Sequence, residues 1–85
     1  MKIENLANNQ VVVTDGKKKI FSSYGKTIAV VNNGKTTLDK VYWNFSVTTT
    51  KYLSRFLGGE KKSDIQKNIN SGYYELSNLN WYGRR

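Results

Sequence analysis

Basic side chains at regular intervals are the clearest candidates for contacts with a ligand in this sequence. Lys51 and Arg55 are four residues apart, so on a helix they lie one turn apart and their charges add at one place. Lys17, Lys18 and Lys19 follow one another at the expected tip of a hairpin. Such groups could hold phosphates or a cluster of carboxylates. The alternative is a solvated helix face and a charged turn, because lysines at strand edges also prevent sheet aggregation.

A second group of polar side chains has the same helical spacing. Gln66 and Asn70 are four residues apart, and Lys67 stands beside Gln66. Amide side chains can pair with adenine edges, and a lysine with phosphates, when a helix enters the major groove of DNA. The connection between the two predicted helices contains glycines and is longer than in a helix-turn-helix motif. A solvated outer face explains the same three residues.

Aromatic residues offer a third kind of contact. Tyr42, Trp43 and Phe45 would make a stacking platform for single-stranded bases if they were exposed beside cations. In a domain of this size most of these rings must instead build the core.

The C-terminal end carries candidate anchors for a protein interface, since indoles and arginines dominate binding hot spots. These anchors are Trp81, Tyr82, Arg84 and Arg85.

The sequence lacks the residues that most enzyme active sites use. The chain has no cysteine and no histidine, so thiolate metal sites, the usual zinc sites and Ser-His or Cys-His pairs cannot form. Gly25-Lys26-Thr27 and Gly34-Lys35-Thr36 imitate the end of a phosphate-binding loop, but both lack its first glycine and both lead into strands. We therefore expect a non-enzymatic protein that acts by binding, without a metal or cofactor.

Length and charge limit the number of domains and the kinds of partner. The 85 residues make one domain, and 38% hydrophobic residues without proline are typical of a folded globule. The net charge of +8 favours nucleic acid, a nucleoprotein or another acidic partner, although solubility alone could explain it. The longest aliphatic run, Ile28 to Val31, is too short to cross a membrane, and no apolar signal region precedes it. We expect a cytoplasmic protein with no membrane partner.

Turn signals divide the first half of the chain into strands. Asn8-Asn9, Asp15-Gly16, Tyr24-Gly25 and Asn33-Gly34 each separate two β-prone runs. Asp15-Gly16 and Asn33-Gly34 predict tight hairpins in which both central residues have positive φ. The last run, from Thr36 to Trp43, continues as a further strand.

Two helices should follow. The first should run from about Thr48 and end at Gly58-Gly59, because glycine readily adopts the left-handed cap conformation. Its apolar side chains fall within one arc of about 140°; they are Tyr52, Leu53, Phe56 and Leu57. Its opposite arc holds Thr50, Lys51, Ser54 and Arg55.

The second helix is predicted from its capping signal. Ser63 and Gln66 have the spacing of a capping box, so this helix should begin at Ser63. It should end at Gly72, with Ile65 and Ile69 on its buried side, and Tyr73 to Leu76 should add a final strand. The predicted fold class is α+β: an antiparallel β-meander of four to five strands, followed by two short helices and a C-terminal strand. The unpaired edges of such a sheet would allow a homodimer.

Three motifs between Ser23 and Leu57 follow one another in a definite order. They are Ser-Tyr-x-x-x-Ile-Ala from Ser23, Tyr-Trp-x-Phe/Tyr-Ser from Tyr42, and Thr-Thr-x-Lys-Tyr-x-x-x-Phe-Leu from Thr48. In this order the segment resembles a group of small uncharacterised proteins from phages and mobile elements of Gram-positive bacteria. It departs from the group at Thr50, where serine or glycine is commoner. The resemblance implies a phage or plasmid accessory protein, acting in the host cell, and brings no established activity.

Two kinds of function agree with these features. The first is an accessory protein that binds nucleic acid or a nucleoprotein, with phosphates held by Lys51, Arg55 and the Lys17 to Lys19 hairpin. Its affinity would fall steeply as salt rises. The alternative is a protein-binding inhibitor of a host nuclease or defence complex, anchored by Trp81, Tyr82 and the terminal arginines. Accessory proteins of phages often act in this second way, as anti-CRISPR proteins do.

Overall fold

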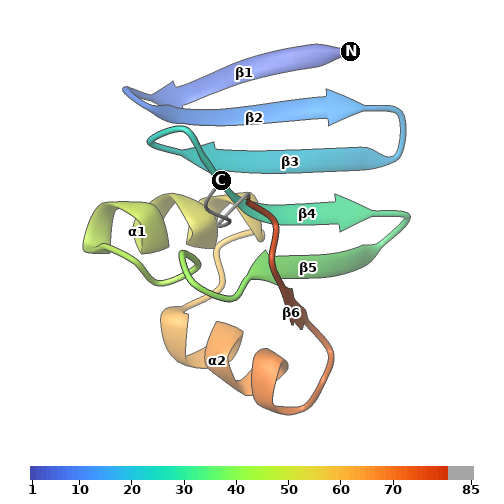
Figure 1. Ribbon diagram of the computed structural model, residues 1–85, viewed down its shortest axis with the longest axis vertical. Coiled ribbons are helices and arrows are strands. Elements are labelled where there is room, and N and C mark those ends of the chain that lie inside the picture. The colour runs from blue at the N-terminus through green and yellow to red at the C-terminus, as the bar shows by residue number, and fades with distance from the viewer. Residues whose placement is uncertain (81–85) are drawn as a thin grey trace, which may run out of the picture.

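The computed structural model describes residues 1–80 and contains one six-stranded sheet and two helices (Figure 1). The strands follow one another across the sheet in chain order, from β1 to β6. The first five form an antiparallel meander, and β6 pairs with β5 in parallel. The predicted α+β fold is therefore confirmed. The elements are β1 (Lys2–Ala7), β2 (Gln10–Asp15), β3 (Lys18–Ser23), β4 (Lys26–Asn32), β5 (Lys35–Asp39), α1 (Val47–Phe56), α2 (Lys62–Asn70) and β6 (Glu75–Ser77).

Two-residue turns join β2 to β3, β3 to β4 and β4 to β5. At Asn33-Gly34 both central residues have positive φ, +57° and +81°, as the sequence predicts. The turn predicted at Asp15-Gly16 lies one residue later. Asp15 pairs with Lys18 at the strand ends, so Gly16 and Lys17 form the turn, and Gly16 alone of the two has positive φ. The hairpin itself is present.

Strand β5 ends earlier than predicted because of Asp39. This residue is fully buried, and its Oδ2 accepts hydrogen bonds from the backbone N–H groups of Val41 (3.1 Å) and Tyr42 (2.8 Å). Its Oδ1 accepts a third from the N–H of Leu79 (2.8 Å). The carboxylate therefore turns the chain out of the sheet and fastens the segment after β6 to the same point. The predicted strand to Trp43 was wrong in its last four residues.

The first helix begins at a serine cap. The Oγ of Ser46 accepts a hydrogen bond from the N–H of Thr49 at 3.1 Å, and satisfies a backbone donor that the first turn leaves without a helical partner. After Leu57, Gly58 and Gly59 have positive φ, as expected for the end of the helix.

The second helix begins before the predicted capping box. The carbonyl of Lys61 already accepts hydrogen bonds from the N–H groups of Asp64 and Ile65, both at 3.0 Å, so Ser63 lies inside the helix and caps nothing. A tertiary contact lies just before this start. Glu60 accepts hydrogen bonds from the Tyr74 hydroxyl (2.7 Å) and from Asn68 Nδ2 (3.3 Å), which holds the preceding chain against the helix.

The core lies between the sheet and the helices. Phe21 lies between Val12 and Ala29 in the strand register, and Ala29 lies opposite Leu38, so one row of apolar side chains crosses four strands. Leu53 of α1 is fully buried as predicted, and Tyr52, Phe56 and Leu57 pack against the core while partly exposed. Buried hydrophobic residues of the core are Val12, Phe21, Ile28, Ala29, Leu38, Trp43, Leu53, Ile65 and Tyr74.

Two stacked phenylalanines allow a test of this packing. The rings of Phe21 and Phe56 are 5.7 Å apart between centroids, but Phe21 is fully buried whereas Phe56 is partly exposed. Phe21→Ala should lower the free energy of unfolding by about 3 to 5 kcal/mol, and Phe56→Ala by about 2 kcal/mol. Urea unfolding of both variants measures the difference. Equal losses would contradict the burial of Phe21 in the core.

Candidate nucleic-acid interface

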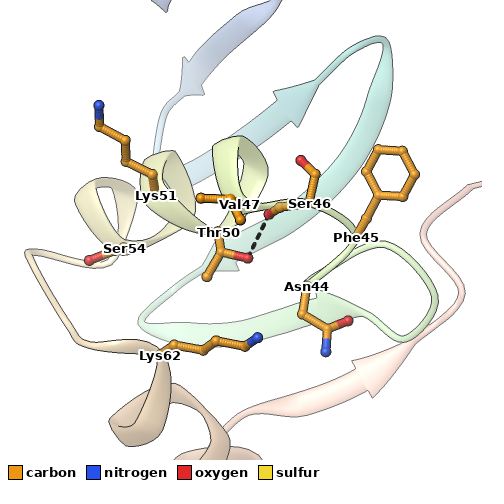
Figure 2. A pocket seen from close by; sticks show the side chains of 8 residues that line it. All are labelled: Asn44, Phe45, Ser46, Val47, Thr50, Lys51, Ser54 and Lys62. Atoms are coloured by element: carbon orange, nitrogen blue, oxygen red, sulfur yellow. Dashed lines mark hydrogen bonds between the residues drawn. The ribbon is translucent and has the colours of Figure 1, made fainter.

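An open hollow of about 540 Å³ lies beside the start of α1. Its walls come from the loop before α1, from the outer face of that helix and from the first residue of α2 (Figure 2). It contains two lysines, three hydroxyl side chains and an exposed phenylalanine, and no acidic residue lines it. The lining residues are Asn44, Phe45, Ser46, Val47, Thr50, Lys51, Ser54 and Lys62. We call this the Phe45 hollow.

The helix phase decides which side chains of α1 reach the hollow. Thr49 and Leu53 are fully buried, so Thr50, Lys51 and Ser54 must lie on the outward side. Thr50 is fixed there, because its Oγ1 donates a hydrogen bond to the carbonyl of Ser46 at 2.9 Å (Figure 2). This side of α1 is the polar arc predicted from the sequence.

Lys62 enters the hollow through the linker between the helices. The Ser54 hydroxyl donates a hydrogen bond to the carbonyl of Glu60, so the linker is tied to α1 two residues before Lys62. The side chain of Glu60 is held in turn by Tyr74 and Asn68. The second lysine of the hollow therefore depends on tertiary contacts.

Phe45 provides an apolar surface beside these cations. Its side chain is 56% exposed and meets the ring of Tyr42 edge-to-face, with centroids 5.4 Å apart. Lys26 Nζ lies 5.5 Å from the Tyr42 centroid, which brings a third cation to this aromatic pair. Trp43, by contrast, is buried. Of the three aromatic residues considered for a stacking platform, Phe45 is the exposed one.

Lys51 and Arg55, the predicted basic ridge of α1, both lie beside the ring of Tyr52. Lys51 Nζ lies 5.6 Å from the centroid of Tyr52, and Arg55 Cζ lies 5.3 Å from it. Both cations are exposed. They extend the positive charge of the Phe45 hollow along α1 toward the sheet.

The three hairpin lysines do not form one patch. Lys19 lines a second hollow of about 260 Å³ together with Arg55 and Glu4, on the face of the sheet that α1 covers. Lys18 lines a depression on the opposite face together with Lys35. Lys17 lies in the turn and is exposed. Because neighbouring residues of a strand point to opposite faces, the structure brings only Lys19 toward the α1 ridge.

The polar residues of α2 lie away from the hollow. Gln66, Lys67 and Asn70 are all exposed, whereas Ile65 is buried in the core. Gln66 Nε2 donates a hydrogen bond to Asn70 Oδ1 at 3.1 Å, which leaves both exposed amides with further donors and acceptors. Neither amide lines the Phe45 hollow.

The remaining predictions concern the C-terminal anchors, metal binding and membrane spans. Trp81, Tyr82, Arg84 and Arg85 lie beyond residues 1–80. Within residues 1–80, no group of three or more acidic, cysteine or histidine side chains is placed to hold a metal ion. None of the described helices is long and apolar enough to cross a membrane.

Tyr74 anchors the linker that carries Lys62, and its ionisation is shifted. Burial, and then the hydrogen bond to Glu60, raise the pKa of Tyr74 to about 12. An unfolded tyrosine ionises near pH 10. The stability that this shift represents is present below pH 10 and is lost as pH rises through 12.

This pH dependence can be measured by urea unfolding between about pH 9 and pH 12. Other groups also titrate there, so the comparison is with Tyr74→Phe, which removes the ionising group. The variant should lose less stability than the natural chain over this range. The same loss in both proteins would contradict the role of Tyr74.

Fold and site together define a small basic α+β domain with an open, cation-lined hollow beside its first helix. The chain belongs to the Family of unknown function (DUF8033), whose model matches residues 1–72. That match includes the whole Phe45 hollow and the Lys51–Arg55 ridge. Neither the curated proteins nor the solved structures include a match to this chain.

Proposed function

We propose that this protein is a non-enzymatic accessory protein that binds nucleic acid, with single-stranded segments entering the Phe45 hollow. The observation that carries the proposal is the exposed ring of Phe45 in a lining that contains Lys51 and Lys62 and no carboxylate. Proteins that bind single strands combine such parts: an aromatic side chain stacks on a base, and cations hold the neighbouring phosphates.

The size and polarity of the hollow agree with one nucleotide. A volume of about 540 Å³ lies within the range of small-ligand pockets. Lys51 and Lys62 provide charge for a phosphate, and Asn44 provides an amide for a base edge. Bases in a duplex are stacked on one another, so their faces cannot meet Phe45 without unpairing. The proposal therefore favours single-stranded over double-stranded nucleic acid.

The Lys51–Arg55 ridge extends the contact beyond one nucleotide. Arg55 and Lys19 line the second hollow, so a strand that leaves the Phe45 hollow along α1 would meet further cations. These contacts are with phosphates and carry no sequence information. The ridge therefore adds affinity without selecting a particular sequence.

We further propose that the protein serves a phage or mobile element of a Gram-positive bacterium and acts in the cytoplasm of the host. The support is the order of motifs from Ser23 to Leu57, which resembles proteins of that origin. A nucleic-acid binder of this size could act on the single strands that replication or host nucleases expose.

Fluorescence anisotropy of labelled single-stranded DNA, RNA and double-stranded DNA across a salt series tests the proposed binding. If three to four cations contact phosphates, the logarithm of the association constant should fall against the logarithm of salt with a slope of about −2 to −3 for single strands. Binding to the duplex should be weaker. No binding to any of the three at low salt would overturn the proposal and direct the search to a protein partner.

A further inference from the structure

The free edge of β1 has features that point to a second copy of this chain. β1 is the outermost strand of the sheet and pairs with β2 on one side (Figure 1). Its other side presents backbone donors and acceptors without a strand partner among residues 1–80. Such an edge is a template for pairing with another strand unless it is blocked.

The register fixes which backbone groups face outward. Asp15 and Lys18 close a two-residue turn, so they are a hydrogen-bonded pair, and alternation along the ladder makes Val13 and Ile20 another. The backbone of Val13 therefore points toward β3. Ile3, which lies opposite Val13, must direct its own N–H and C=O away from β2, toward the free edge.

An apolar row crosses the face of the sheet opposite α1 and leads to this edge. Ile3 lies opposite Val13, Val13 opposite Ile20, and Ile20 opposite Val30. Residues directly opposite in neighbouring strands share a face, and this row lies on the side opposite the core residues Val12 and Phe21. Ile3 is 64% exposed at its end.

We propose that two copies join through β1 in an antiparallel pair with Ile3 opposite Ile3 across a twofold axis. The two Ile3 residues then form a hydrogen-bonded pair and extend the apolar row from one copy into the other. Lys2 of each copy lies opposite Glu4 of the other. The dimer thus contains two pairs of opposite charges.

Charge complementarity selects this register. Hydrogen bonding through the outward groups of Ile3 allows antiparallel registers that differ by two residues. A shift one way places Glu4 opposite Glu4, and a shift the other way places Lys2 opposite Lys2. Both alternatives oppose like charges, which is destabilising. A further shift would bring the irregular part of β1, between Asn5 and Ala7, into the strand pairing. Ile3 opposite Ile3 is the register that pairs opposite charges.

The dimer would present both candidate interfaces on the same side. An antiparallel pair of edge strands continues the sheet, so the α1-covered faces of the two copies stay on one face of the joined sheet. The interface is short and lies at the small end of known interface sizes, so we expect a dimer that dissociates on dilution. A strand of nucleic acid that spans both hollows would strengthen it through bivalent binding.

Sedimentation equilibrium at physiological ionic strength tests the interface by charge exchange. Lys2→Glu and Glu4→Lys each oppose like charges at two symmetric places, so each should raise the dimer dissociation constant by about tenfold. The double variant, with both changes, restores opposite charges and should return to the natural value. A chain that is monomeric at every accessible concentration would overturn the proposal, and so would single variants that dimerise normally.

A proline variant tests the backbone part of the same interface. Ile3→Pro removes an N–H that faces away from β2, so β1 and β2 can stay paired, as prolines on edge strands allow. Circular dichroism should show a folded protein, and sedimentation a monomer. A folded Ile3→Pro variant that still dimerises would show that another surface joins the copies. Loss of dimerisation here does not depend on nucleic-acid binding, so the two proposals can fail separately.

Discussion

Replacing Asp39 by alanine should lower the free energy of unfolding by about 3 to 5 kcal/mol. The Asp39 side chain is fully buried and accepts hydrogen bonds from the backbone N–H groups of Val41, Tyr42 and Leu79. Alanine would leave these three donors without their acceptor. Leu79 is forty residues away in the sequence, so the variant releases both the turn after β5 and the segment after β6.

Urea unfolding followed by tryptophan fluorescence measures this loss. Asp39→Asn keeps one acceptor oxygen and should lose less stability than Asp39→Ala. Asp15→Ala is the matched control, because Asp15 is an exposed carboxylate at the end of β2, and its removal should cost less than about 0.5 kcal/mol. Asp39→Ala with the stability of the control would contradict the anchoring role of Asp39.

Reversing both charges of the Phe45 hollow, by Lys51→Glu with Lys62→Glu, should weaken binding of single-stranded DNA by about 30- to 150-fold at low salt. A lysine that holds a phosphate contributes about 1 to 1.5 kcal/mol to binding, and the variant removes two such lysines. The salt slope should also become shallower, by about 0.7 for each phosphate that is no longer neutralised. Anisotropy titrations of a labelled oligonucleotide give both quantities.

The chain offers a control with the same net charge. Lys18→Glu with Lys35→Glu changes two lysines on the opposite face of the sheet and should weaken binding only slightly, through long-range charge. Phe45→Ala separates stacking from charge: it should cost about 1 to 3 kcal/mol of binding and leave the salt slope unchanged. Equal losses of affinity in the two charge-reversed proteins would contradict a localised site.

Local signals in the sequence predict most of this fold. Asn33-Gly34 forces positive φ at two successive residues, and the spacing of Leu53 and Phe56 sets the buried side of α1, so the meander and the first helix follow from short stretches. Errors occur where contacts between residues distant in the sequence determine the end of an element: β5 ends at Asp39, whose carboxylate also accepts a hydrogen bond from Leu79, forty residues later. The Ser63 capping box is also wrong, because α2 begins at Lys62 with Lys61 as its cap residue.

Only part of the candidate site could be predicted from the sequence. Lys51 could be placed on an outward helix face from periodicity alone, and the alternation of a strand could have separated Lys18 from Lys19. Lys62 gave no signal, because it reaches the hollow through the Ser54–Glu60 hydrogen bond and the anchored linker. Phe45 could equally have been a core residue, but in the structure Trp43 is buried and Phe45 is exposed.

Proton–nitrogen NMR correlation spectra of the ¹⁵N-labelled protein, titrated with a short thymidine oligonucleotide, test the proposed interface most directly. The largest shift changes should occur in the backbone amides from Asn44 to Lys51 and at Ser54 and Lys62, with smaller changes at Arg55 and Lys19. The amides of Lys18 and Lys35 should stay almost unchanged. Shift changes centred on Lys18 and Lys35, or none at low salt with excess oligonucleotide, would contradict binding at the Phe45 hollow.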